Sequence, residues 1–115
     1  MIYIVEDDQT FADCIERYCE NRDTKIFSNA IDAMSSIDEK FPDLIFLDIL
    51  LTGPDGFTFL NELVSYKDTA KIPVVIISSL DLDDKDLSIY GVVGILNKDT
   101  LTPKEVKDYV IRYSH

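Results

Sequence analysis

The stretch Leu44-Ile45-Phe46-Leu47-Asp48 places four apolar residues in a row ahead of an acid, and a loop with two glycines and a proline follows it. A continuous apolar run of this length is typical of a strand that is buried on both faces in a parallel sheet. Asp48 is then expected at the carboxyl end of that strand. In open α/β sheets this is the edge at which ligands bind.

Similar apolar runs, separated by helix-like segments, recur along the whole chain. The predicted strands are residues 2–5, 24–27, 44–47, 74–77 and 92–96, and the predicted helices carry the apolar stripes of residues 11–19, 30–37, 57–64 and 106–113 and a weaker acidic segment, 81–90. Right-handed crossovers between such strands predict one domain, residues 1–115, with a doubly wound α/β fold and a five-stranded parallel sheet. For five strands we expect the flavodoxin-like order 2-1-3-4-5, with the more polar second strand at an edge.

Composition and charge narrow the function classes. The chain has 115 residues and a formal net charge of −11, which argues against direct contact between this domain and nucleic acid. No apolar run is long enough to span a membrane, and no signal peptide precedes the first strand, so a cytoplasmic location is expected. Cys14 and Cys19 lack the spacing of a CxxC redox or zinc motif and are predicted to be core residues.

Polar residues follow four of the predicted strands at their carboxyl ends: Glu6, Asp7, Asp48, Ser78 and Lys98. Each of them alone has an ordinary explanation, such as a surface acid, a helix cap or a surface lysine. Together they converge on one edge of the sheet. Three carboxylates that lie close together repel one another unless a hard divalent cation relieves them, and Mg²⁺ prefers such oxygen ligands. An acid, a magnesium ion, an ammonium group and a hydroxyl suit phosphoryl transfer to a carboxylate.

In order and spacing these residues resemble the receiver domain of two-component response regulators, and the resemblance covers essentially the whole chain. The acidic pair is Glu6-Asp7, the phosphoacceptor is Asp48, and the family's Asp-Gly is Asp55-Gly56. The resemblance implies a receiver fold and further roles for named residues. Mg²⁺, with Mn²⁺ as a substitute, would be held by Glu6, Asp7, Asp48 and the Leu50 carbonyl; phosphate would be bound by Ser78, Ser79 and Lys98; and Leu50 and Leu80 would tune the phosphoryl lifetime.

The resemblance also implies partners. A sensor histidine kinase or a histidine phosphotransfer protein would donate the phosphoryl group. The fourth helix, fifth strand and fifth helix would form the face for an output domain or target protein, or for a homodimer. The protein would promote its own phosphorylation and slow dephosphorylation without being an enzyme. It would act alone or as the receiver of a longer regulator, most often a transcriptional one.

Three positions depart from the family pattern. The usual proline four residues after the phosphoacceptor is Thr52 here, with a proline at Pro54 instead. Ile95 stands where many receivers have an aromatic switch residue, and Asp99 follows Lys98 in place of proline. The common coupling of the serine to an aromatic switch, and a cis bond after the lysine, are therefore not expected.

Other phosphate-handling classes fit less well. A phosphatase of the haloacid dehalogenase type needs Asp-x-Asp, whereas Asp48-Ile49-Leu50 lacks the second acid. The acidic first loop would repel the phosphate of a flavin mononucleotide, and the Gly-rich loop of a P-loop nucleotidase is missing. The alternative that remains is a receiver-like interaction module that is not phosphorylated.

Overall fold

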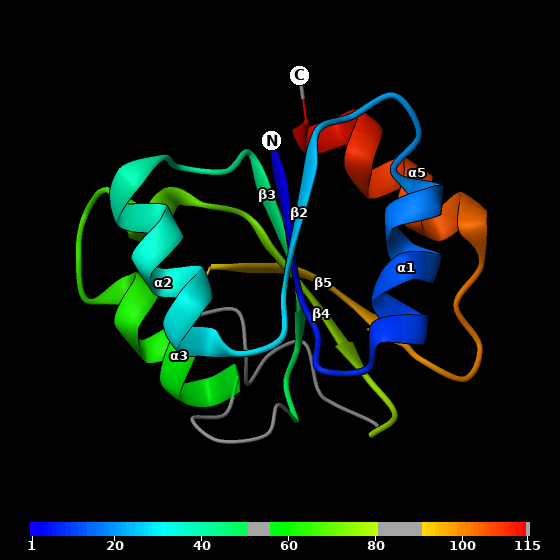
Figure 1. The fold of residues 1–115 in the computed structure, drawn as a ribbon, viewed down its shortest axis with the longest axis horizontal. Coiled ribbons are helices and arrows are strands. Elements are labelled where there is room, and N and C mark those ends of the chain that lie inside the picture. Colours follow the sequence, from blue (N-terminus) through cyan, green and yellow to red (C-terminus); the bar gives the residue numbers. More distant parts are fainter. Residues whose placement is uncertain (51–55, 81–90, 115) are drawn as a thin grey trace.

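The computed structural model describes residues 1–50, 56–80 and 91–114 and contains the predicted five-stranded parallel sheet. Its strands are β1 (Ile2–Val5), β2 (Thr24–Phe27), β3 (Leu44–Asp48), β4 (Val74–Ser78) and β5 (Val92–Asn97). Their order is β2-β1-β3-β4-β5, so the predicted order and the edge position of β2 are confirmed. The carboxyl ends of β1, β3 and β4 all point to the lower side of Figure 1, away from the two termini.

Helices cover both faces of the sheet. α1 (Gln9–Tyr18) and α5 (Pro103–Tyr113) lie on one face, and α2 (Ala30–Glu39) and α3 (Gly56–Val64) lie on the other, as Figure 1 shows. Because successive side chains of a strand point to opposite faces, each strand contributes to two separate cores. In β1, for example, Ile2 and Ile4 pack under α1 and α5, whereas Tyr3 and Val5 pack under α2 and α3.

The helix starts are specified locally. The side chains of Asp8 and Asn29 accept hydrogen bonds from backbone N–H groups in the first turns of α1 and α2. α5 begins with a reciprocal capping box between Thr102 and Glu105, with Pro103 as its first residue. These caps fix where each helix leaves the edge of the sheet.

Some sequence-based expectations need correction in detail. The apolar stripe predicted over residues 57–64, which form most of α3, is wrong in part: Phe59, Leu60 and Leu63 are buried, whereas Phe57 is 39% exposed. A short 3₁₀ helix, η1 (Thr69–Lys71), was not expected. Cys19 is buried as predicted, but Cys14 is only half-buried. The predicted helix at residues 81–90 lies outside the described residues.

The described helices include none with the length and apolar character needed to cross a bilayer.

Candidate functional site

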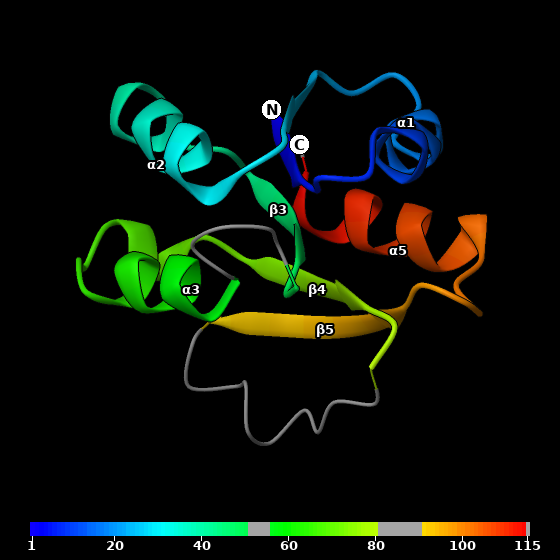
Figure 2. The same cartoon turned by 60° about the horizontal axis from the view of Figure 1, so that its bottom comes forward.

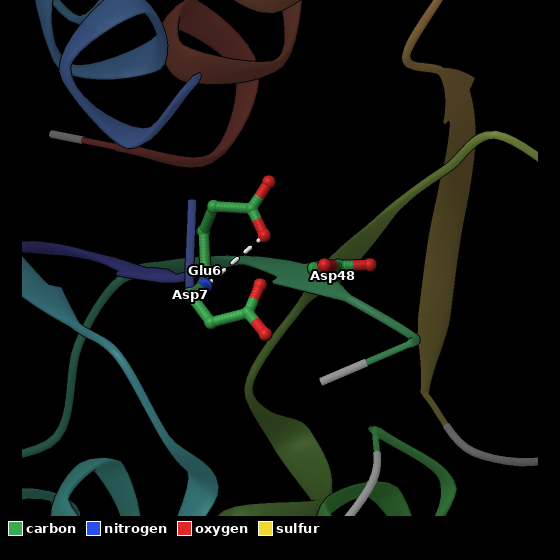
Figure 3. A group of neighbouring side chains, drawn as sticks. All are labelled: Glu6, Asp7 and Asp48. Carbon is green, nitrogen blue, oxygen red and sulfur yellow. Dashed lines mark hydrogen bonds between the residues drawn. The ribbon is translucent and has the colours of Figure 1, made fainter. Parts of the chain in front are cut away.

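Three carboxylates meet where β1 and β3 end. Val5 pairs with Leu47, so Glu6 and Asp48, the residues that follow them, leave neighbouring strands at the same level. One oxygen each of Glu6, Asp7 and Asp48 lies within 4.8 Å of the others, and Figure 3 shows the group. Glu6 is 3% exposed and Asp48 is 5% exposed, whereas Asp7 is open to solvent. The cluster therefore combines two buried acids with one at the surface.

Lys98 reaches this cluster from the far side of β4. Its backbone N–H donates to the Ser78 carbonyl at 2.9 Å, which joins the ends of β4 and β5. Its Nζ lies 2.5 Å from Glu6 Oε1 and 3.3 Å from Asp48 Oδ2. The contact with Asp48 has hydrogen-bond geometry, whereas the contact with Glu6 Oε1 is an ion pair outside that geometry. A single ammonium is thus shared between two buried carboxylates.

This arrangement shifts the protonation of Glu6. Burial of the carboxyl, together with the hydrogen bond and charge of Asp48, raises the pKa of Glu6 to about 8, although Lys98 acts in the opposite direction. Burial lowers the pKa of Lys98, but its contacts with the carboxylates of Glu6 and Asp48 outweigh burial, so its pKa lies above the ordinary value. One ammonium can offset only one of the two buried carboxylates, and Glu6 therefore takes up a proton readily.

Backbone groups after β3 hold Asp48 in place. The Leu50 N–H donates to Asp48 Oδ1 at 3.0 Å, and the Gly56 N–H donates to the Ile49 carbonyl at 3.1 Å. A Cβ on Gly56 would lie 2.6 Å from the Ile49 Cα, closer than non-bonded atoms approach. Only glycine fits there, so the glycine that the sequence analysis singled out brings α3 against the end of β3.

The other predicted residues lie around the cluster. Ser78 is fully buried at the end of β4, and its hydroxyl accepts the Leu80 N–H at 3.0 Å. Ser79 is exposed, and the side chains of Leu50 and Leu80 are about half exposed. The structure thus brings Glu6, Asp7, Asp48 and Lys98 together and places Ser78 on the intervening strand. Thr52 and Pro54 lie outside the described residues.

One residue at the site was missed. Phe11, in the first turn of α1, places its ring centroid 4.8 Å from Lys98 Nζ. Because Phe11 fits the apolar stripe of the helix, its sequence position predicts a core residue and does not predict a contact with the lysine. Its position three residues after the Asp8 cap was the one available signal, because that spacing puts it at the same edge as Glu6.

The donor set fits a hard divalent cation. Carboxylate oxygens are the ligands that Mg²⁺ and Mn²⁺ prefer. Glu6 Oε1 is buried, and its charged neighbour is the Lys98 ammonium, so this oxygen already lies where a cation is favourable. The open side at Asp7 leaves room for the waters that Mg²⁺ retains.

Comparison with known proteins finds a family match over nearly the whole chain. A protein-family model described as the response regulator receiver domain matches residues 2–110.

Relatives of known function match part of the chain. Regulatory protein VanR of Enterococcus faecium is 31% identical and transcriptional regulatory protein CssR of Bacillus subtilis is 36% identical, each over 84 residues or 71% of this chain. The matches cover 35% of VanR and 36% of CssR, so the chain spans about a third of the length of these relatives.

Among solved structures, the signal receiver domain of a signal transduction histidine kinase from Syntrophus aciditrophicus is similar at a TM-score of 0.82. The two are 26% identical in sequence, and the match covers 97% of this chain and 87% of the other. The fold thus agrees with a family that the sequence already resembled.

Proposed function

The chain belongs to the response regulator receiver domain family, and from this premise we propose that Asp48 accepts a phosphoryl group from a phosphohistidine. One observation carries the proposal: a buried carboxylate at the end of the central strand lies within reach of a lysine and two further acids. Acids that only make a surface polar remain exposed, because burial of an ionised carboxylate is costly.

Asp48 is the nucleophile of the proposed transfer. A carboxylate oxygen forms a bond to phosphorus while the phosphorus–nitrogen bond of the donor histidine breaks, and the electron pair of that bond stays with the histidine. The Leu50 N–H holds Asp48 Oδ1, so the carboxylate enters the reaction in one orientation. A reacting group that is already oriented has less entropy to lose on the way to the transition state.

The metal site of the proposal comprises the carboxylates of Glu6, Asp7 and Asp48 and the backbone carbonyl of Leu50. Mg²⁺, or Mn²⁺ in its place, would neutralise charge on the phosphoryl oxygens. Lys98 supplies a second positive charge, and its position 3.3 Å from Asp48 Oδ2 supports this role. Ser78 and the backbone N–H of Ser79 complete the phosphate site.

The acyl phosphate on Asp48 is proposed to hydrolyse slowly. The side chains of Leu50 and Leu80 are exposed beside the site and can neither orient nor deprotonate a water molecule. A lifetime of seconds for phosphorylated Asp48 would contradict this expectation. Leu80→Asn should shorten the lifetime, because an amide can orient a water molecule there.

The partners of the proposal are a sensor histidine kinase or a histidine phosphotransfer protein, as the donor, and an output domain or target protein. VanR and CssR are about three times as long as the matched region, which supports a receiver attached to a transcriptional output domain. The output face would include β5 and α5, and homodimerisation through that face belongs to the same proposal. The segment 81–90, the other part of this face, lies outside the described residues.

The decisive test is phosphorylation itself. The purified chain is incubated with Mg²⁺ and acetyl phosphate, and intact mass is measured beside that of Asp48→Asn. The wild type should gain the mass of one phosphoryl group, and Asp48→Asn should gain none. Beryllofluoride with Mg²⁺ should also change the NMR spectrum of the wild type alone. If the two proteins are indistinguishable in both measurements, the chain is a receiver-like interaction module without phosphorylation.

A further inference from the structure

Phe11 lies beside the site but is not one of the residues proposed to bind the metal or the phosphoryl group. It is the third residue of α1, and its backbone N–H donates to Asp8 Oδ1 at 3.2 Å, so the helix cap fixes its position. Its side chain is half-buried and packs against the core under α1 and α5. The Lys98 ammonium lies over this ring, with Nζ 4.8 Å from the centroid. An ammonium at this distance over an aromatic face is attracted by the ring quadrupole.

Lys98 thus has three partners, and they differ in kind. Glu6 Oε1 and Asp48 Oδ2 are charged oxygens that a divalent cation would also bind. The Phe11 ring is uncharged and has no lone pair that a hydrated Mg²⁺ seeks. A metal ion therefore competes with Lys98 for its carboxylates and not for the ring.

We propose that Phe11 is the positioning residue that keeps the Lys98 ammonium at the site when a divalent cation takes over Glu6 and Asp48. The inference rests on the proposed function, because it assigns Phe11 a role in presenting Lys98 to the phosphoryl group. Without the ring, the lysine would be repelled by the metal and would extend into solvent, since its side chain is already 21% exposed. With the ring, the ammonium stays where the phosphoryl oxygens arrive.

If Phe11 positions Lys98, it should affect the affinity for a phosphoryl group differently from the affinity for the metal alone. Binding of a phosphoryl group or its analogue needs Lys98 at the site, so Phe11 should strengthen it. Binding of the metal alone brings a dication toward a retained ammonium, so Phe11 should leave that affinity unchanged or weaken it slightly. A residue that acts only by packing would change both affinities in the same direction, through the stability of the fold.

The first experiment reads the contact directly, without metal. In the NMR spectrum of the metal-free wild type, the ε-methylene protons of Lys98 should be shifted upfield by the ring current of Phe11. Phe11→Leu should abolish this shift, and Phe11→Tyr should keep it. Tyr18→Leu is the matched control: Tyr18 is a half-buried aromatic of the same helix that packs against the same core. An unshifted Lys98 in the wild type would overturn the inference.

The second experiment tests whether Phe11 affects the two affinities differently. Affinities for Mg²⁺ alone, and for beryllofluoride at saturating Mg²⁺, are measured for the same four proteins. Phe11→Leu should weaken beryllofluoride binding by about twofold to tenfold, the range of a partly exposed cation–π contact. It should not weaken Mg²⁺ binding, and Phe11→Tyr should restore the wild-type value. Tyr18→Leu should resemble the wild type in both measurements.

The outcomes distinguish the inference from the function on which it rests. If the wild type binds beryllofluoride and Phe11→Leu binds it equally well, the positioning role is wrong and the proposed function stands. If Phe11→Leu loses affinity for Mg²⁺ and beryllofluoride in the same proportion, Phe11 acts through packing alone. If the wild type binds no beryllofluoride, both proposals fail together.

Discussion

The strands β3 and β5 run parallel in one sheet, yet they are built differently. Every residue of β3, including Asp48, is buried, whereas Leu96 is the one fully buried residue of β5. β3 lies at the centre between β1 and β4, and β5 lies at an edge, as Figure 2 shows. Both strands lead to a residue of the site, Asp48 and Lys98. Asp48 therefore comes from an enclosed part of the sheet and Lys98 from a more open one.

The difference separates a fixed group from a movable one. Asp48 is held by its strand, by the Leu50 N–H and by the close approach of Gly56 to Ile49. Lys98 is joined to β4 at its backbone, through the Ser78 carbonyl, and its long, partly exposed side chain extends across β4 to Glu6, Asp48 and Phe11. A nucleophile needs one orientation, whereas a counter-charge has to follow the group that it neutralises.

The largest expected effect compares the interiors of the two strands. Phe46→Ala in β3 removes a fully buried ring and should lower the free energy of unfolding by about 3 to 5 kcal/mol. Val93→Ala in β5 alters a side chain that is 38% exposed and should cost less than about 1 kcal/mol. Urea denaturation measures both. Equal losses would show that β5 is as tightly packed as β3.

Metal binding should act through the acids at the ends of β1 and β3. At a Mg²⁺ concentration of about 100 times Kd, the free energy of unfolding should rise by about 2.7 kcal/mol, because only the folded chain holds the acids together. Asp7→Asn should remove most of this gain, and Asp108→Asn, an exposed acid of α5, should retain it. Thermal unfolding with Mg²⁺ and with a chelator measures the difference. A similar gain in Asp7→Asn would place the metal elsewhere.

Two glycines sharpen the comparison. A methyl group on Gly56 meets backbone atoms of Ile49, and the end of β3 cannot yield, so Gly56→Ala should cost about 2 to 3 kcal/mol. The atoms nearest to a methyl group on Gly94 in β5 belong to the side chain of Tyr109 in α5, which can rotate away, so Gly94→Ala should cost about 1 kcal/mol. Chemical denaturation ranks the two. If Gly94→Ala is the more damaging, the ring of Tyr109 is locked in place.

An effect of pH is expected from Glu6, because Lys98 offsets only part of the charge of the two buried carboxylates. The pKa of Glu6 is about 8 in the folded protein, above its ordinary value of 4.5, so the folded state binds this proton more tightly than the unfolded state. The resulting stabilisation is complete below about pH 4.5 and is lost as the pH rises to about 8.

In the metal-free wild type, the urea concentration at the denaturation midpoint should therefore decrease as the pH is raised from 5 to 8. Glu6→Gln should show less of this fall, and Glu62→Gln, at an exposed acid of α3, should behave as the wild type. Parallel curves for all three proteins would mean that Glu6 is ionised throughout.

The sequence predicted the parts of the molecule that follow from strand order. Five apolar runs and right-handed crossovers determine which residues share an edge, so Glu6, Asp48 and Lys98 could be placed together before any coordinates were known. The helix starts at Asp8 and Thr102 were predictable for a similar reason, because a cap acts within four residues.

Contacts that depend on side-chain orientation were not predictable. Apolar residues occupy both sides of the segment 57–64, so periodicity alone could not show that Phe57 faces outward. The Lys98–Glu6 pair joins side chains from strands that are not neighbours, and the Phe11 contact depends on where a helix cap places one ring. These depend on packing between elements, which a one-dimensional pattern does not encode.

The division of each strand between two cores has an evolutionary consequence. Adjacent residues such as Tyr3 and Ile4 lie in different compartments, so a substitution at one places no direct constraint on the size of the other. The layer of α1 and α5 and the layer of α2 and α3 can therefore diverge at independent rates. A lineage could adapt the helices on one side of this sheet to a new partner while the other side keeps its inherited sequence.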